Sequence, residues 1–138
     1  MSDNQTLEEK FQTFNNTSDT TDQFDPQDIQ NNKVMAALSY FGILVLIPIL
    51  AAKDSKFARF HANQGLIFLI ACIILSVANA ILSSVIIGIS WRLYWLSSII
   101  SLIVGLVCLI FFIIGIINVV NGRAKELPVI GHYKLLAV

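Results

Sequence analysis

The chain has 138 residues, of which 56% are hydrophobic and only 13% are charged, and its mean hydropathy is +0.74. These values lie outside the range of soluble globular proteins and indicate a membrane protein. No basic tract with interleaved aromatic residues occurs, which excludes nucleic-acid binding. The formal net charge of zero hides an asymmetry, because seven of the nine acidic residues precede Val34. Most of the Lys and Arg residues lie in two later clusters.

Residues 1–32 are rich in Asn, Asp, Gln and Thr and carry few apolar side chains. Such a composition cannot offset the entropy of ordering, so we expect a disordered polar and acidic tail. Thr6 and Glu9 fit a capping box. The apolar residues between Leu7 and Phe14 recur on one helical face, so a short helix that touches the membrane surface is the alternative for this stretch.

The first apolar run, residues 34–52, has no charged residue. As a helix it would be about 28 Å long, just enough to cross a hydrocarbon core of about 30 Å. We predict that it is the first transmembrane helix. Pro48, near its end, is expected to kink the helix or loosen its last turn, and a re-entrant segment is the alternative.

The second and third transmembrane helices are predicted to span about 63–89 and 95–120. Each contains an uncharged run that is longer than a bilayer requires, so both are expected to tilt or to project into the interface. Asp54 or Ser55 is the expected N-cap of the second helix. Gly122 fits the left-handed residue that commonly closes a helix such as the third.

A short link joins the second and third helices. It carries Trp91, Tyr94 and Trp95 around Arg92, and aromatic rings at the end of an apolar run are typical of the headgroup region of a membrane. After the third helix, residues 123–138 are interrupted by proline and glycine. We therefore expect this segment to lie at the interface and not to form a fourth span.

The predicted fold is an all-α polytopic membrane helix bundle, with three transmembrane helices within residues 33–122. Three spans place the two termini on opposite sides of the membrane. The basic residues of the first loop and of the C-terminal segment then share one side, which the positive-inside rule assigns to the cytoplasm, with the acidic N-terminal tail outside. This arrangement predicts an integral membrane protein, and in an organelle the side assigned to the cytoplasm would be the stroma.

Small residues and one amide within the spans allow the helices to approach closely. The candidate packing residues are Ser76, Asn79, Ser101, Gly105 and Gly115. Asn79 lies near the middle of the second span and is expected to point inward and form a hydrogen bond. Contact between helices or between copies of the chain is the favoured interpretation, and a polar site in a transport pathway is the alternative. Besides the lipid bilayer, the expected partners are therefore other chains, in a homo- or hetero-oligomer.

The sequence carries no recognisable catalytic or metal-binding pattern. No Asp, Glu, Lys or Arg lies inside a predicted span, and no HExxH, Walker or GxSxG motif occurs. Cys72 and Cys108 are expected to be packing residues, because neither has a second thiol or a histidine at ligand spacing. His61 has no second metal ligand at helical spacing, so a structural role is expected for it. We predict a protein that is not an enzyme and has no cofactor.

The stretch KFARFHANQGL, which enters the second span, and INVVNGRAKELPVIG, which leaves the third, resemble a known family. It contains the Tic twenty-kilodalton subunit of the chloroplast inner-envelope import machinery and small bacterial relatives. The opening KVMAALSYFGILVLIPIL is similar too, so the likeness covers residues 33–136. The matching positions are Phe57, Arg59, Phe60, His61, Asn63, Gln64, Gly65, Asn118, Gly122, Pro128, Ile130 and Gly131.

This resemblance implies a helical scaffold or subunit of a protein or peptide translocation assembly. Plastid members have four spans, whereas this chain has three predicted spans and no recognisable plastid transit peptide, so we expect a relative in the bacterial plasma membrane. Two other classes of function stay open. One is an immunity or binding protein that acts against a membrane-active peptide. The other is a small-molecule transporter, which would have to oligomerise because three spans without an intramembrane charge cannot enclose a path alone.

Overall fold

The computed structural model describes residues 3–137, with side chains from residue 6 onward. The α-helices are α1 (Asp3–Phe14), α2 (Pro26–Asn31), α3 (Lys33–Leu38), α4 (Leu46–Ala51), α5 (Lys56–Ile89) and α6 (Tyr94–Val120). Short 3₁₀ helices are η1 (Thr21–Gln23), η2 (Gly42–Val45) and η3 (Trp91–Leu93). No strand forms within the described residues, so the prediction of an all-α fold is confirmed.

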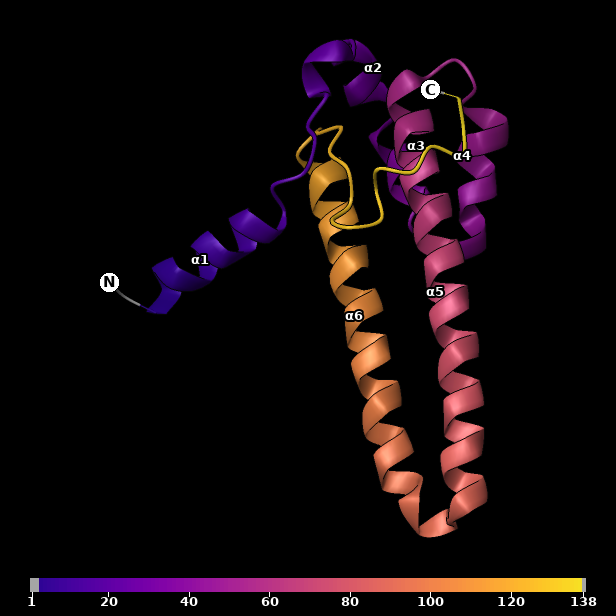
Figure 1. Cartoon of the computed structure of the whole chain (residues 1–138). Helices are drawn as coiled ribbons and strands as arrows, with labels where there is room; N and C mark the ends of the chain where they lie inside the picture. Colours follow the sequence, from indigo (N-terminus) through magenta and orange to yellow (C-terminus); the bar gives the residue numbers. More distant parts are fainter. Residues whose placement is uncertain (1–2, 138) are drawn as a thin grey trace.

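Helices α5 and α6 form a long antiparallel hairpin that is closed by η3 (Figure 1). They are 34 and 27 residues long, and both are apolar enough to cross a membrane. Ser55 caps the start of α5, because its Oγ accepts a hydrogen bond from the backbone N–H of Ala58 at 3.0 Å. Just past the end of α6, Gly122 has a φ of +66°. The two long predicted spans are therefore present as continuous helices.

The predicted first span is not a single helix. Residues 34–52 are divided among α3, η2 and α4, and neither α3 nor α4 is long enough to cross a membrane. The chain turns at Gly42, which has a φ of +59° that favours glycine. Pro48 lies in the first turn of α4, where its missing N–H leaves no helical hydrogen bond unmade. The prediction of three transmembrane helices is thus not confirmed, and the segment instead folds back beside the start of α5.

Buried side chains concentrate at the end of the molecule where α5 begins and α6 ends. We call this end the head, and it comprises residues 17–67 and 114–137. Its apolar core is formed by Ile29, Ala36, Tyr40, Phe57, Phe60, Ile114, Val119, Ala124 and Leu127. The head therefore holds the first apolar run, the start of α5, the end of α6 and the C-terminal segment together.

Residues 17–32 belong to the head and do not form the disordered tail that their composition predicts. The backbone N–H of Thr20 donates to the carbonyl of Ala124 at 3.0 Å. Ile29 is buried in the apolar core, and Phe24 packs against that core. These two apolar side chains, spaced among polar ones, are enough to dock the segment because the remainder of the head supplies the core.

Residues 17–32, which we call the N-terminal layer, and the C-terminal segment lie at the same end of the molecule (Figure 1). The prediction that the N-terminal tail and the C-terminus lie on opposite sides of a membrane therefore does not hold for residues 17–32. The physical reason is the turn at Gly42, which returns the first apolar run to the head.

Helix α1 projects away from the head (Figure 1). At its end, the ring of Phe14 packs edge-on against Phe111 of α6, with a centroid distance of 6.3 Å. Leu7 and Phe11 are exposed. The short helix that was the alternative for this stretch is thus present, and its apolar side chains are uncovered.

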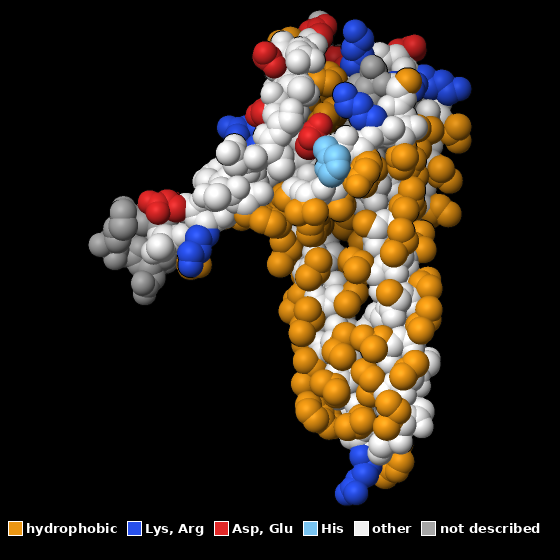
Figure 2. All heavy atoms as spheres, viewed as in Figure 1, with side chains coloured by type: hydrophobic (Ala, Val, Ile, Leu, Met, Phe, Trp, Pro, Cys, Tyr) orange, Lys and Arg blue, Asp and Glu red, His pale blue; other side chains and the backbone are white. Residues whose placement is uncertain are grey.

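Hydrophobic side chains cover the hairpin beyond the head, whereas charged side chains gather on the head (Figure 2). At the far tip, Trp91 and Trp95 are 78% and 61% exposed and flank Arg92. A continuous apolar surface with aromatic residues and a cation at its end is typical of a protein embedded in hydrocarbon.

Candidate functional site: a polar core beneath the C-terminal strap

Several polar residues at the start of α5 are buried in the head. His61, Asn63 and Gln64 are all less than 4% exposed, although they lie directly before the uncharged run that begins at Leu66. A buried polar group is destabilising unless it is hydrogen-bonded. The partners of these three side chains therefore define the architecture of the head.

His61 joins three separate parts of the head. Its Nδ1 accepts a hydrogen bond from the hydroxyl of Tyr40 at 2.9 Å, and its Nε2 donates to the carbonyl of Arg123 at 3.0 Å. A ring that accepts at one nitrogen and donates at the other is neutral. Burial lowers the pKa of His61, and this effect outweighs the opposing hydrogen bond to Arg123. No ring nitrogen is left free to bind a metal ion.

Gln64 holds the C-terminal strap, which we define as residues 124–137. Its Nε2 donates to the carbonyl of Gly131 at 2.8 Å, and its Oε1 accepts from the backbone N–H of Leu127 at 2.9 Å. Gly131 has no room for a side chain, because an added Cβ would lie 2.5 Å from the same Oε1 atom. The strap can therefore approach α5 this closely only with glycine at position 131.

Two further residues of α5 bind the end of the strap. Asn63 donates through Nδ2 to the carbonyl of Tyr133 at 3.0 Å and accepts through Oδ1 from the N–H of Leu135 at 2.7 Å. The guanidinium of Arg59 donates to the carbonyl of Ala137, from Nε at 2.9 Å and from Nη2 at 2.6 Å. The start of α5 thus acts as a template that the strap follows through backbone contacts.

Two glycines leave space for residues of the first apolar run. An added Cβ at Gly65 would lie 2.6 Å from the carbonyl carbon of Ser39, and one at Gly115 would lie 2.6 Å from Cδ1 of Tyr40. Real Cβ atoms do not come this close to other heavy atoms. Gly65 on α5 and Gly115 on α6 therefore form two notches into which the turn after α3 inserts.

The remaining motif residues also lie in the head. Asn118 is 2% exposed, and its carbonyl accepts from the N–H of Arg123 at 2.8 Å, while its Nδ2 has no partner among the described residues. Gly122 ends α6, and Pro128 is fully buried in the strap. The structure thus brings the motif residues at the start of α5 together with those that follow α6.

The candidate packing residues within the hairpin have different surroundings. Asn79 donates through Nδ2 to the hydroxyl of Ser101 at 3.0 Å and so joins α5 to α6. Ser76 is exposed, and nothing lies within 4 Å of a Cβ added at Gly105. Gly105 therefore makes no close helix contact within this molecule, and a role for Ser76 and Gly105 between copies stays a prediction.

Cys72 and Cys108 face each other across the hairpin, with their Sγ atoms 3.0 Å apart. The hairpin brings these two thiols together although they are distant in sequence, and the expectation that both are packing residues stays a prediction. Both thiols are free. No group of three His, Cys, Asp or Glu residues that could bind a metal occurs in the part of the chain that the structure describes.

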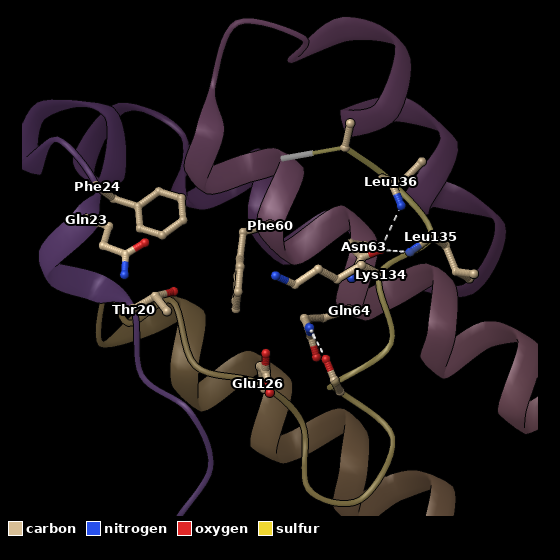
Figure 3. A pocket seen from close by; sticks show the side chains of 12 residues that line it. Thr20, Gln23, Phe24, Phe60, Asn63, Gln64, Glu126, Lys134, Leu135 and Leu136 are labelled. Carbon is tan, nitrogen blue, oxygen red and sulfur yellow. Dashed lines mark hydrogen bonds between the residues drawn. The ribbon is translucent and has the colours of Figure 1, made fainter.

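A cavity of about 430 Å³ lies between the N-terminal layer, the start of α5 and the strap. Figure 3 shows Lys134 and Glu126 pointing into it from the strap, with Gln23 and Phe24 on one side and Phe60 of α5 between Phe24 and Lys134. The sequence did not predict this cavity, because two of its three walls belong to segments that were expected to be a disordered tail and an interfacial segment.

A head that gathers most of the charged side chains, together with a hairpin of two long apolar helices, marks the chain as a small helical membrane protein. Over residues 31–134 it matches the model of the MamF_MmsF family, described as the magnetosome magnetite crystal formation protein family. The chain belongs to this family.

Two relatives illustrate the relationship. The chain is 35% identical over 101 residues to magnetosome protein MmsF of Paramagnetospirillum magneticum, which covers 70% of this chain and 79% of the relative. It is 32% identical over 99 residues to magnetosome protein MamF of Magnetospirillum gryphiswaldense, which covers 72% and 78% respectively. No solved structure matches the chain.

Membership of this family corrects the resemblance to the plastid import subunit. The residues that carried the resemblance, from Phe57 to Gly131, lie within the matched range and build the head. These residues therefore stabilise the fold of the head, and they do not indicate a role in protein import. The prediction of a translocation subunit is wrong, and the immunity and transporter alternatives fit the family no better.

Proposed function

We propose that this chain acts in the formation of magnetite crystals, as a membrane-anchored protein of the magnetosome. The observation that carries the proposal is the family match over residues 31–134. This range contains α3 to α6 and most of the strap, so it includes both the hairpin and most of the head core. The relatives MmsF and MamF are named as magnetosome proteins.

We further propose that the hairpin crosses the bilayer twice and that the head stays on one face. The uncovered apolar surface of α5 and α6 supports two crossings. Eight of the nine Lys and Arg residues lie in α1 or the head, and only Arg92 lies at the far tip. The positive-inside rule then places the head in the cytoplasm. In this arrangement the first apolar run is a re-entrant segment and not a third span.

The head has the character of a binding surface, and we propose that the protein works without catalysis. Both ring nitrogens of the buried His61 are hydrogen-bonded, and the side-chain amides of Asn63 and Gln64 are hydrogen-bonded to the strap. The lipid bilayer is one partner of the protein. Contact between copies through Ser76 of α5 and Gly105 of α6 is a second proposal, because both positions are exposed in one molecule.

Complementation tests the proposed role. This chain would be expressed in Paramagnetospirillum magneticum cells that lack MmsF, and crystal lengths would be measured by electron microscopy. We expect the crystal lengths to move towards those of the parent strain. A Gly65→Leu variant is the matched control, because a side chain at this notch displaces Ser39 while the hairpin keeps its apolar surface.

A chain that reaches the membrane in normal amount while crystal lengths stay those of the deletion strain would contradict the proposal. Full activity of the Gly65→Leu variant would show instead that an intact head is not required for this role.

The proposed topology has its own test. Single cysteines would be placed at Ser18 and at Ser90 in a chain that carries Cys72→Ser and Cys108→Ser. A membrane-impermeant maleimide applied to cells with a permeable outer membrane should label position 90 and not position 18, and inverted vesicles should give the reverse. Labelling of both positions from the same side would contradict a hairpin that crosses twice.

A further inference from the structure

We propose that the head holds one phospholipid whose headgroup carries both a phosphate and a primary ammonium. Its phosphate would lie beside Lys134, its ammonium beside Glu126, and one acyl chain along α5 below the strap. This inference goes beyond the proposed role in crystal formation, and it rests on the proposed placement of the hairpin in a bilayer.

The charges in the cavity select a zwitterionic headgroup. Lys134 and Glu126 point into the same space of about 430 Å³ (Figure 3). In the described part of the chain, neither side chain has a hydrogen bond or an ion pair. A ligand with negative charge alone would meet Glu126, and one with positive charge alone would meet Lys134. A ligand that carries both charges satisfies both residues. A primary ammonium can also donate hydrogen bonds to the Glu126 carboxylate, which the trimethylammonium group of phosphatidylcholine cannot.

An apolar groove lies further along α5. It has a volume of about 270 Å³ and is lined by Ile67, Ile70, Ala71, Ile74, Ile130, Tyr133 and Leu135. The groove has no polar lining, so it suits a hydrocarbon chain and not a second headgroup.

The cavity and the groove share one helical face and one wall. Phe60, Asn63 and Gln64 line the cavity, and Ile67, Ile70 and Ile74 continue the same face at spacings of three and four residues. Leu135 of the strap lines both spaces. A single amphipathic molecule can therefore occupy both, with its polar end among charges and its apolar end among isoleucines.

The level of the site in the proposed membrane fits a lipid. The cavity lies beside Asn63 and Gln64, and the uncharged run of α5 begins two residues later at Leu66. This boundary is where the headgroup region meets hydrocarbon, and it is where lipid phosphates lie. A soluble phosphate compound could fill the cavity but would leave the groove empty, so the structure favours the lipid.

Native mass spectrometry of the full-length protein in detergent tests the inference. Delipidated protein would be mixed with equal amounts of phosphatidylethanolamine, phosphatidylglycerol or phosphatidylcholine that carry the same acyl chains. We expect one phosphatidylethanolamine to be retained about tenfold more than either other lipid, as a pair of charge-assisted contacts would give.

Variants assign each contact. Lys134→Gln should lower retention of phosphatidylethanolamine about tenfold. Glu126→Gln should lower it too, but should raise retention of the anionic phosphatidylglycerol. Leu135→Gln should weaken retention through the groove. Lys53→Gln is the matched control, because Lys53 is an exposed cation of the head that does not line the cavity.

Three outcomes would overturn the inference: equal retention of the three lipids by the unaltered protein, equal effects of Lys134→Gln and Lys53→Gln, and displacement of the lipid by an equal concentration of soluble phosphoethanolamine. The last result would mean that the site recognises only a headgroup. Circular dichroism of each variant checks that its helices are intact, and the raised retention of phosphatidylglycerol by Glu126→Gln would show that this variant has kept its fold.

Discussion

Helix α5 runs through two regions of the molecule that are stabilised in different ways. Between Phe57 and Ile67, nine of its residues are buried, and their polar atoms are held by the strap and by the first apolar run. From residue 68 to residue 89 none is buried. The same helix is therefore part of the buried core in the head, whereas in the hairpin its apolar side chains are not buried.

The difference shows that the two regions place different demands on their side chains. In the head, hydrogen bonds to buried amides fix a single arrangement, because a misplaced strap would leave buried polar groups unpaired. In the hairpin, lipid can replace the missing core, so the demands on individual side chains are fewer. Substitutions should therefore act more strongly in the head, and the predictions below test this contrast.

The largest effect is expected from Gly65→Ala in the head. The added Cβ would overlap the carbonyl of Ser39, and overpacking of this kind costs about 3 kcal/mol. Gly105→Ala in α6 is the matched control, since nothing lies within 4 Å of its added Cβ. That variant should be neutral or more stable by up to about 1 kcal/mol. Chemical unfolding in detergent, followed by circular dichroism, measures both, and equal destabilisation would refute the contrast.

Gln64→Ala should have the next largest effect, because it leaves the N–H of Leu127 and the carbonyl of Gly131 without their buried partner. We expect a loss of about 2 to 3 kcal/mol. Release of the strap should also expose Lys125, which is 8% exposed in the intact head. The rate of trypsin cleavage after Lys125 should therefore rise. Gln30→Ala, at an exposed position, is the control and should leave this rate unchanged.

The head should lose stability in mild acid because of His61. The folded protein keeps this residue neutral, with its pKa lowered by burial, whereas the unfolded chain takes up a proton near pH 6.5. The stability contributed by the neutral ring is thus complete above about pH 6.5 and is lost as the pH falls below it, by up to about 1.4 kcal/mol per pH unit.

His61→Gln gives the comparison for this pH dependence. A glutamine can accept from Tyr40 and donate to Arg123 but does not titrate. Unfolding curves of the two proteins between pH 7.5 and pH 5 should diverge below about pH 6.5. Parallel curves would show that His61 is not the group responsible.

The smallest effect is expected in the hairpin, from Asn79→Ala. This variant removes the hydrogen bond to Ser101, and such bonds between membrane helices contribute about 0.6 kcal/mol on average. A double-mutant cycle with Ser101→Ala in bicelles measures the coupling. Ser84→Ala is the control, because its hydroxyl bonds only to Ala80 of its own helix. A coupling free energy above about 2 kcal/mol would mean that single side-chain contacts contribute as much to stability in the hairpin as in the head.

The hairpin is the part of the fold that was readable from the sequence. Long uncharged runs predict α5 and α6, and the N-cap at Ser55 is confirmed. The sequence also indicates which side chains meet across the hairpin, because the two members of each pair are equally distant from Ser90. Cys72 and Cys108 each lie 18 residues from it, and Asn79 and Ser101 each lie 11 residues from it. A tight link makes such pairs neighbours.

The head was harder to predict because its contacts join distant segments. Hydropathy treats residues 34–52 as one run and does not register the left-handed turn at Gly42. Composition likewise describes residues 17–32 as a tail, although Phe24 and Ile29 dock on a core that other segments provide. The motif at Phe57 to Gly65 was found, but its partners in the strap become visible only in the folded chain.

Arg92 at the tip of the hairpin has a consequence for insertion. If the hairpin crosses twice from the side of the head, this guanidinium must pass the hydrocarbon centre, where an arginine costs about 2.5 to 3.5 kcal/mol on insertion scales. Once across, it can bind phosphates of the far leaflet, while Trp91, Tyr94 and Trp95 settle beside it. Withdrawal would require breaking those contacts and repeating the passage, so the tip makes extraction from the bilayer slow after the protein has entered.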